Sequence, residues 1–201
     1  LKDQKIERIS ELTPYEFLDS KYVPDTIVGT YKIKGTFFNI SEFASIDDQS
    51  IKELFYFVSH GNSAFLSMKT FPQPLLDSLK VDFRTDFNYS DSTSIWLANK
   101  NVSSKKFHMI EGMDNYYFSK IDTSKTTVLG YQANTTNKKR INFIKVPYAN
   151  GYFYLHTQPA AFTNFHLLKS NHSQYAENVL SYIPKGDVFW YTKGQNKNSI
   201  S

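Results

Sequence analysis

The sequence of 201 residues contains no cysteine. This absence excludes thiol nucleophiles, thiolate metal ligands and disulfides, and it removes the residue from which a redox compartment is usually inferred. No run approaches the roughly 18 consecutive apolar residues of a membrane-spanning helix, and no signal-peptide pattern is present. A strong excess of one charge is also lacking, because 23 Lys and Arg oppose 19 Asp and Glu. The basic residues are scattered apart from Lys138-Lys139-Arg140, which we interpret as a solvated loop tip, so no nucleic-acid partner is expected.

Apolar side chains, by contrast, are plentiful enough to build a substantial core, since 40% of the residues are hydrophobic and 16% are aromatic. We predict a single α/β domain over residues 1–192, followed by a polar tail over 193–201. Because the sequence begins at Leu1 without a methionine, we expect it to be a piece of a longer protein. Most of the 17 Phe and 14 Tyr fall in apolar runs, so core packing explains them better than stacking on sugars or bases.

A short helix is predicted near the N-terminus. Thr13 is placed to cap it, Pro14 occupies its first position, and Glu16 can reach back to the cap, which together make a capping box. The helix should end at about Asp19. Residues 31–40 then hold an apolar and β-branched run that suits a buried strand.

The clearest element is the helix that follows. Asp47 can cap it, Ile46 and Ile51 stand at the two positions of a hydrophobic staple, and Gly61 should end it in a left-handed conformation. Residues 62–68 return as another buried strand. The strand, the helix and the second strand have the size that a right-handed parallel crossover requires.

The second half of the chain predicts a mixed sheet. A brief helix begins at Pro74, and a later one carries an apolar stripe from Tyr175 to Ile183. Strands are expected at 94–97, 116–119, 126–131, 141–146, 151–157 and 187–191. The pair Asn150-Gly151 is a strong hairpin signal between two of them. The predicted fold is therefore a mixed, mainly parallel α/β sheet with flanking helices and a C-terminal hairpin.

Five histidines could carry chemistry: His60, His108, His156, His166 and His172. No pair has the i,i+4 spacing of a helical zinc site, and no Asp/Glu cluster accompanies them. His156 and His166 lie ten residues apart across a loop and could converge on one ion, but hydrogen-bonded structural roles are the better interpretation. Ser59 beside His60 fits the chemistry of a helix end better than a nucleophile and its base. We therefore predict no metal and no cofactor.

The most informative stretch begins at Gly151 and forms a buried strand that ends in polar residues, followed by a loop and a helix. Open α/β sheets place ligand crevices at the carboxyl ends of such strands. The candidate ligand-binding residues are His156, Gln158, Asn164, His166 and, from a neighbouring turn over 59–62, His60. Asn164 can also serve as a loop-fixing residue, because asparagine side chains commonly bond nearby backbone. No catalytic residue is assigned.

Several segments resemble a known bacterial family. They are Glu53-Leu54-Phe55-Tyr56-Phe57-Val58-Ser59-His60-Gly61, the following Phe65-Leu66-Ser67, Gly151-Tyr152-Phe153 through Pro159, Phe162-Thr163-Asn164, and Asn171. On these segments nearly the whole chain is similar to the family known as domain of unknown function 4350, and closely to its Bacteroidetes-type members. The motifs identify a family and carry no activity of their own.

The resemblance implies a flavodoxin-like layered sheet similar to class I glutamine amidotransferases. It also implies an extracytoplasmic, periplasmic domain held at the cell membrane by segments outside this chain, with a protein partner that can belong to a MoxR-type ATPase system. Amidotransferases use a cysteine at a strand-to-helix elbow and a histidine after a late strand. Here the late strand ends in His156-Thr157-Gln158, but no cysteine exists, so that triad cannot form.

The sequence thus predicts a non-catalytic module that binds a ligand or a protein at the cell envelope. The alternative is a hydrolase of envelope glycans or peptides that uses a histidine base and an activated water. It requires His156 or His166 in an open pocket beside a metal or a carboxylate, for which Glu42, Asp47 and Glu111 are candidates. A third possibility, sugar binding, requires exposed aromatic rings gathered on one face.

Overall fold

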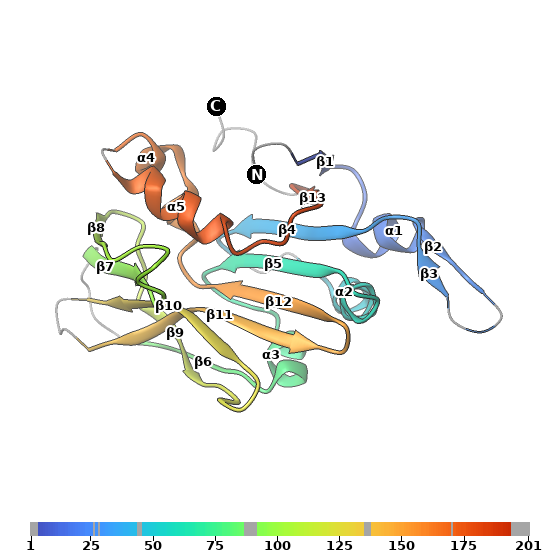
Figure 1. The fold of residues 1–201 in the computed structure, drawn as a ribbon, viewed down its shortest axis with the longest axis horizontal. Helices are drawn as coiled ribbons and strands as arrows, with labels where there is room; N and C mark the ends of the chain where they lie inside the picture. The colour runs from blue at the N-terminus through green and yellow to red at the C-terminus, as the bar shows by residue number, and fades with distance from the viewer. Residues whose placement is uncertain are drawn as a thin grey trace.

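The computed structural model describes residues 4–25, 27, 29–43, 46–86, 92–134, 138–169 and 171–193. Within these residues one large sheet has the strand order β1-β13-β4-β5-β12-β11-β10-β7-β8, with β9 beside β11 and β6 beside β9 (Figure 1). Its strands are β1 (Ile6–Ile9), β4 (Gly35–Ser41), β5 (Ser63–Met68), β6 (Asp82–Thr85), β7 (Ser92–Leu97), β8 (Lys106–Ile110), β9 (Tyr116–Lys120), β10 (Thr127–Ala133), β11 (Arg140–Tyr148), β12 (Gly151–His156) and β13 (Asp187–Tyr191). A separate pair consists of β2 (Tyr22–Val23) and β3 (Thr30–Tyr31).

The sheet has a parallel half and an antiparallel half. Strands β1, β13, β4, β5 and β12 are all parallel to one another, whereas β11, β10, β7 and β8 continue the sheet in antiparallel pairs. The prediction of a mixed α/β sheet is confirmed. The antiparallel half is larger than the sequence indicated, because it includes strands β6 and β8, which the prediction left in loops.

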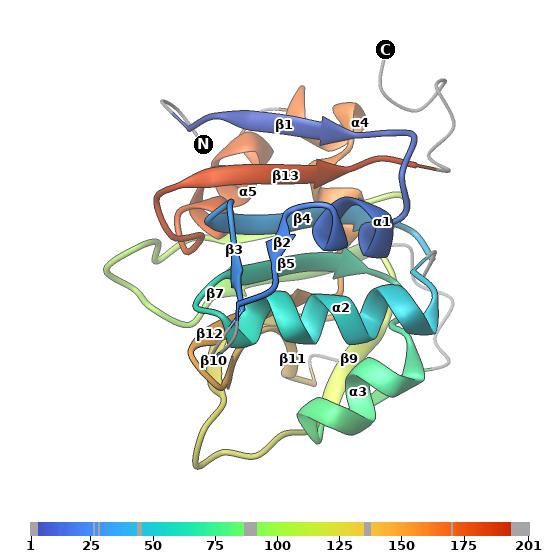
Figure 2. The same ribbon diagram turned by 90° about the vertical axis from the view of Figure 1, so that its right-hand side faces the viewer.

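Helices cover both faces of the parallel half (Figure 2). The helices α1 (Pro14–Asp19), α2 (Asp48–Ser59) and α3 (Gln73–Leu79) supply apolar side chains to one core. On the other face, the 3-10 helix η1 (Pro159–Phe162) and α5 (His172–Leu180) contribute to a second core, and the short α4 (Asn164–Leu167) lies between them in sequence. Parallel strands need such cover on both sides.

The predicted helix signals in the first half are confirmed. The Thr13 hydroxyl accepts the amide of Glu16 at 3.1 Å, and the Glu16 carboxylate accepts the amide of Thr13 at 2.7 Å, which completes the capping box. Asp47 caps α2 by accepting the amide of Ser50 at 2.9 Å. Gly61 follows that helix with a φ of +83°, in the left-handed region that glycine tolerates.

The predicted hairpin between β11 and β12 exists, but its turn lies one residue earlier than expected. Tyr148 pairs with Gly151, so the turn residues are Ala149 and Asn150, and Ala149 has the positive φ, +48°. Gly151 is instead required by packing, because a Cβ there would lie 2.0 Å from the carbonyl oxygen of Asn62 and 2.3 Å from that of Val58. Its hydrogen side chain lets β12 start against the end of α2.

Other sequence interpretations need correction. The strand expected over 31–40 is interrupted at 32–34, between β3 and β4. Residues 6–9, for which no strand was predicted, form the edge strand β1. Arg140 is not part of a solvated loop tip: it begins β11 and pairs with Asp86, with Nε and Oδ2 3.0 Å apart. Most of the predicted polar tail, residues 194–201, lies outside the described residues. Among the described residues, no helix is both long and apolar enough to cross a membrane.

Replacing Gly151 with alanine should destabilise the domain by about 1–3 kcal/mol, because the added methyl group would overlap two backbone carbonyls. Urea unfolding followed by tryptophan fluorescence measures this change. The matched control is Ala149→Gly, two residues away, which removes a Cβ at a positive φ and should leave the free energy of unfolding unchanged or slightly higher. Equal stability of Gly151→Ala and the wild type would contradict the close approach.

Candidate functional site

The candidate site lies where the parallel strands β5 and β12 end side by side. From β5 the chain runs to α3, which packs into the core on one face, and from β12 it runs to η1, which packs into the core on the other. Loops that leave two neighbouring strands toward opposite faces mark the topological switch point of an α/β sheet. The first polar side chains after these strands are therefore the ones to examine.

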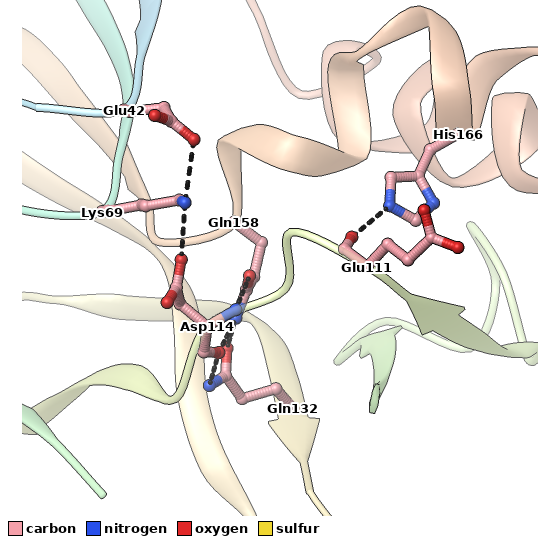
Figure 3. Close-up of polar contacts among 7 residues, drawn as sticks. All are labelled: Glu42, Lys69, Glu111, Asp114, Gln132, Gln158 and His166. Carbon is pink, nitrogen blue, oxygen red and sulfur yellow. Dashed lines mark hydrogen bonds and ion pairs between the residues drawn. The ribbon is translucent and has the colours of Figure 1, made fainter. Parts of the chain in front are cut away.

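Lys69, directly after β5, forms the centre of the site (Figure 3). Its Nζ lies 2.9 Å from Oε1 of Glu42, which follows β4, and 3.0 Å from Oδ2 of Asp114, in the loop between β8 and β9. The Lys69 side chain is only 17% exposed, compared with 32% for Asp114 and 64% for Glu42. A mostly buried ammonium is thus held between two carboxylates, and Glu42 is the member of the group that faces solvent.

The electrostatics of the group follow from this arrangement. Burial by itself lowers the pKa of Lys69, but the hydrogen bonds to Glu42 and Asp114 more than offset it and hold the pKa above its usual value. The ammonium is therefore charged at neutral pH. Two carboxylates against one ammonium give the group a net charge of −1.

Gln158, two residues beyond β12, fixes the backbone of Asp114. Its Oε1 accepts the Asp114 amide at 3.2 Å, and its Nε2 donates to the Asp114 carbonyl and, at 2.8 Å, to Oε1 of Gln132 on β10. Gln132 in turn donates to the carbonyl of Tyr116 at 3.0 Å. Gln158 is almost fully buried, so this predicted site residue holds the loop that carries Asp114 and does not face a ligand itself.

His156, the last residue of β12, belongs to a sealed polar network. Its Nδ1 is 2.8 Å from the Ser67 hydroxyl, and its Nε2 is 2.9 Å from the hydroxyl of Tyr175 on α5. His156, Ser67 and Tyr175 are all 0% exposed. Burial lowers the pKa of His156 to about 3, so the ring is neutral at physiological pH. A substrate has no route to this serine and histidine in the described conformation.

The remaining predicted residues do not gather around His156. His166 is buried on α4, with its Nε2 2.9 Å from the carbonyl of Glu111, and Asn164 is exposed at the start of the same helix. His60 lies after α2 and before β5, at the amino ends of the parallel strands, which is the opposite edge of the sheet. Its Nδ1 is 2.8 Å from the carbonyl of Tyr56. The expected proximity of the 59–62 turn to the strand end is therefore wrong.

Sequence reasoning missed Lys69 and Asp114, the two central members of the site. Lys69 could have been found, because it is the first charged residue after a predicted buried strand. Asp114 could not, since it reaches the site from a loop between strands whose order the sequence did not reveal. Of the carboxylates considered as partners of a histidine base, Asp47 caps α2 and Glu42 pairs with Lys69. The described residues contain no group of three side chains able to hold a metal ion.

No family model and no curated protein sequence matches this chain. Among solved structures it is similar to the carbohydrate deacetylase Agd3, with a TM-score of 0.53 at 10% identity over 88% of this chain and 32% of the other. It is also similar to the N-terminal domain of mmIFT52, with a TM-score of 0.53 at 9% identity over 86% and 81% of the two chains. At these identities the likeness concerns the fold alone.

Weaker similarity extends to glycosidases. The exo-β-1,4-mannosidase Op5Man5 from Opitutaceae bacterium strain TAV5 has a TM-score of 0.49 at 12% identity, over 75% of this chain and 26% of the mannosidase. The β-galactosidase Gan42B from G. stearothermophilus has a TM-score of 0.44 at 12% identity, over 73% and 21% of the two chains. This chain therefore spans about a quarter or less of the length of these enzymes.

Replacing Lys69 with methionine should lower the free energy of unfolding by about 1–3 kcal/mol, because it leaves the partly buried Asp114 carboxylate without its counter-charge. The matched change Glu42→Gln, at a mostly exposed carboxylate, should cost less than about 1 kcal/mol. Chemical denaturation of the three proteins in the same buffer gives both values. A Lys69→Met protein as stable as Glu42→Gln would show that the ion pair with Asp114 contributes little.

The neutral, buried His156 should make the domain sensitive to acid. Below the ordinary pKa of 6.5 the unfolded chain gains a proton at this histidine, whereas the folded protein does not until about pH 3. Between these values the unfolded state binds more protons, so stability falls as the pH falls, by about 2 kcal/mol at pH 5. Unfolding measured from pH 7.5 to 4.5 should show a smaller pH slope for His156→Gln than for the wild type. An identical slope would mean that His156 can be protonated in the folded state.

Proposed function

We propose that this domain is a non-catalytic binding module that holds a protein partner at the carboxyl ends of its parallel strands. The proposal rests on the observation that the reactive side chains at that edge are already bonded to other groups of the protein. Ser67, His156 and Tyr175 bond one another out of contact with solvent, and Lys69 is neutralised by two carboxylates. The member of this group most accessible to a partner is Glu42, whose side chain is 64% exposed.

The charge of the edge supports a partner with basic side chains. The group of Glu42, Lys69 and Asp114 has a net charge of −1, and the exposed Glu111 lies in the same loop as Asp114. A lysine or arginine from a partner could pair with Glu42, and an arginine could do so with two parallel hydrogen bonds. We therefore favour a protein segment that presents lysine or arginine over an acidic or purely apolar ligand.

We also propose that the sheet and its helices have the flavodoxin-like layering that the resemblance to class I glutamine amidotransferases implies. Helices on both faces of β4, β5 and β12, and a switch point between β5 and β12, support it. This chain has no cysteine to act as the nucleophile of such enzymes, and the charged side chain directly after β5 at the switch point is that of Lys69.

The location follows from the same resemblance. We propose that the domain faces the periplasm and that segments outside this chain anchor it in the cell membrane. Its partner would then be a membrane-associated protein, for which a component linked to a MoxR-type ATPase is the candidate. The hydrolase alternative gains no support, because it needs an accessible histidine and both His156 and His166 are at most 1% exposed.

The sugar-binding possibility is also poorly supported. Among the residues that the structure describes, the aromatic rings with the largest exposure are those of Phe43, Tyr56, Tyr152 and Phe165. Tyr56 lies on α2, Tyr152 on β12 and Phe165 on α4, and the remaining Phe43 follows β4. Rings distributed over elements of both faces do not form a single stacking platform.

Nuclear magnetic resonance can test binding directly. The ¹⁵N-labelled domain is titrated with tetra-lysine, tetra-arginine and tetra-glutamate peptides, and amide shifts are followed at Glu42, Lys69, Asp114 and Gln158. The basic peptides should shift these amides and the acidic peptide should not. Glu42→Gln should weaken the response, whereas the matched surface change Glu177→Gln on α5 should leave it intact.

A parallel assay addresses catalysis. The wild-type domain is incubated with muropeptides and with oligosaccharides, and the products are examined by mass spectrometry. We expect no turnover above that of buffer. Turnover that disappears in His156→Gln would contradict a non-catalytic role. Basic peptides that shift no amide at the carboxyl ends of the strands would contradict the proposed binding of a basic partner.

A further inference from the structure

Two histidines outside the site described above face each other. His166 on α4 and His172 at the start of α5 have their Nδ1 atoms 3.4 Å apart, and their rings are inclined by 35°. His166 is buried, whereas His172 is partly exposed, so the pair can be reached from the His172 side. Nothing in the candidate site or in the proposed binding function uses this pair.

The hydrogen bonds fix the tautomer of His166. Its Nε2 lies 2.9 Å from the carbonyl oxygen of Glu111, and a carbonyl oxygen can only accept, so Nε2 carries the proton. In the neutral ring Nδ1 then bears a lone pair, which points toward His172. The Glu111 carbonyl is held in this position by a backbone φ of +65° at Glu111 and +69° at Gly112.

His172 is the hydrogen-bond donor of the pair when both rings are neutral. Because Nε2 of His166 carries its proton, the hydrogen bond between the two Nδ1 atoms has the N–H of His172 as donor and the lone pair of His166 as acceptor. A divalent ion between the two rings would replace this single proton, since a neutral imidazole can carry its proton on Nε2 and coordinate through Nδ1. Burial, followed by the proximity of His166, lowers the pKa of His172, which favours the neutral ring that a metal ligand requires.

The spacing of the two Nδ1 atoms also fits two ligands of one metal ion. In a tetrahedral zinc site with Zn–N bonds of about 2.0–2.1 Å, two nitrogen ligands are separated by about 3.3–3.4 Å. The observed separation of 3.4 Å has this value. In addition, ligating histidines normally donate their other N–H to a carbonyl or carboxylate, which is what His166 does with Glu111.

We propose that His166 and His172 form a binding site for a divalent transition-metal ion, with Zn²⁺, Ni²⁺ or Cu²⁺ as the class of ion and water in the remaining positions. Neutral imidazole suits these ions, whereas Mg²⁺ and Ca²⁺ prefer oxygen ligands. The ion would join α4 to α5. Through the hydrogen bond of His166 to Glu111, it would also support the loop that presents Asp114 to Lys69.

The test uses the tag-free domain after treatment with a chelator. At pH 7.5, Zn²⁺ at about 100 times its dissociation constant should raise the melting temperature by about 5 °C or more, and Mg²⁺ should not. The rise should persist in His60→Gln, a matched change at a distant, partly buried histidine, and should be lost in His172→Gln. An equal rise in His172→Gln, or no rise in the wild type, would overturn the proposal.

A second measurement needs no variant and so does not depend on the folding of His172→Gln. Substoichiometric Cu²⁺ is added to the ¹⁵N-labelled wild-type domain, and paramagnetic broadening of the amides is recorded. Broadening should centre on residues 108–111, 166–169 and 171–173. Broadening centred on His60, or spread evenly over the surface, would contradict a site at the His166–His172 pair.

Discussion

The arrangement of the carboxyl edge depends on one constraint, the need to surround a mostly buried ammonium with negative charge. Lys69 is fixed by its place after β5, and leaving it unpaired there would cost several kcal/mol. Its two carboxylates come from different parts of the sheet, Glu42 after β4 and Asp114 from the antiparallel half. Gln158 after β12 then holds the Asp114 backbone. One buried charge thus joins the ends of three neighbouring strands to the loop between β8 and β9.

At the same edge, the side chains that could perform catalysis are buried, whereas the charged group that could bind a partner is in contact with solvent. Chemistry by a serine or a histidine requires a side chain that can meet a substrate, but Ser67 and His156 turn toward Tyr175 in the core beneath α5. Their polar atoms are satisfied by one another, which is the condition under which buried polar groups are tolerated. The network therefore stabilises the packing of α5 on the sheet. The charged group of Glu42, Lys69 and Asp114 keeps its contact with solvent, chiefly through Glu42.

How much of this could be read from the sequence depends on how local each signal is. Thr13, Asp47 and Gly61 act on neighbouring backbone groups, so the helices that they begin and end were predicted correctly. Strands β6 and β8 were missed because their stability comes from partners distant in the chain. The same distinction applies to the candidate site. Gln158 and His156 were found from the polar end of β12, whereas Asp114 reaches Lys69 only through the pairing of β7, β8 and β10.

The loop from Glu111 to Asp114 connects the two proposed sites, and its backbone explains how. Glu111 and Gly112 have positive φ angles, and a non-glycine residue such as Glu111 adopts this conformation only when its surroundings compensate for it. His166 bonds the Glu111 carbonyl at one end, and Gln158 bonds the Asp114 amide and carbonyl at the other. A ligand that binds at one end of the loop and requires this loop geometry also stabilises the geometry that a ligand at the other end requires. Thermodynamic linkage makes that effect reciprocal, so an ion at His166 and a partner at Glu42 would each favour the binding of the other.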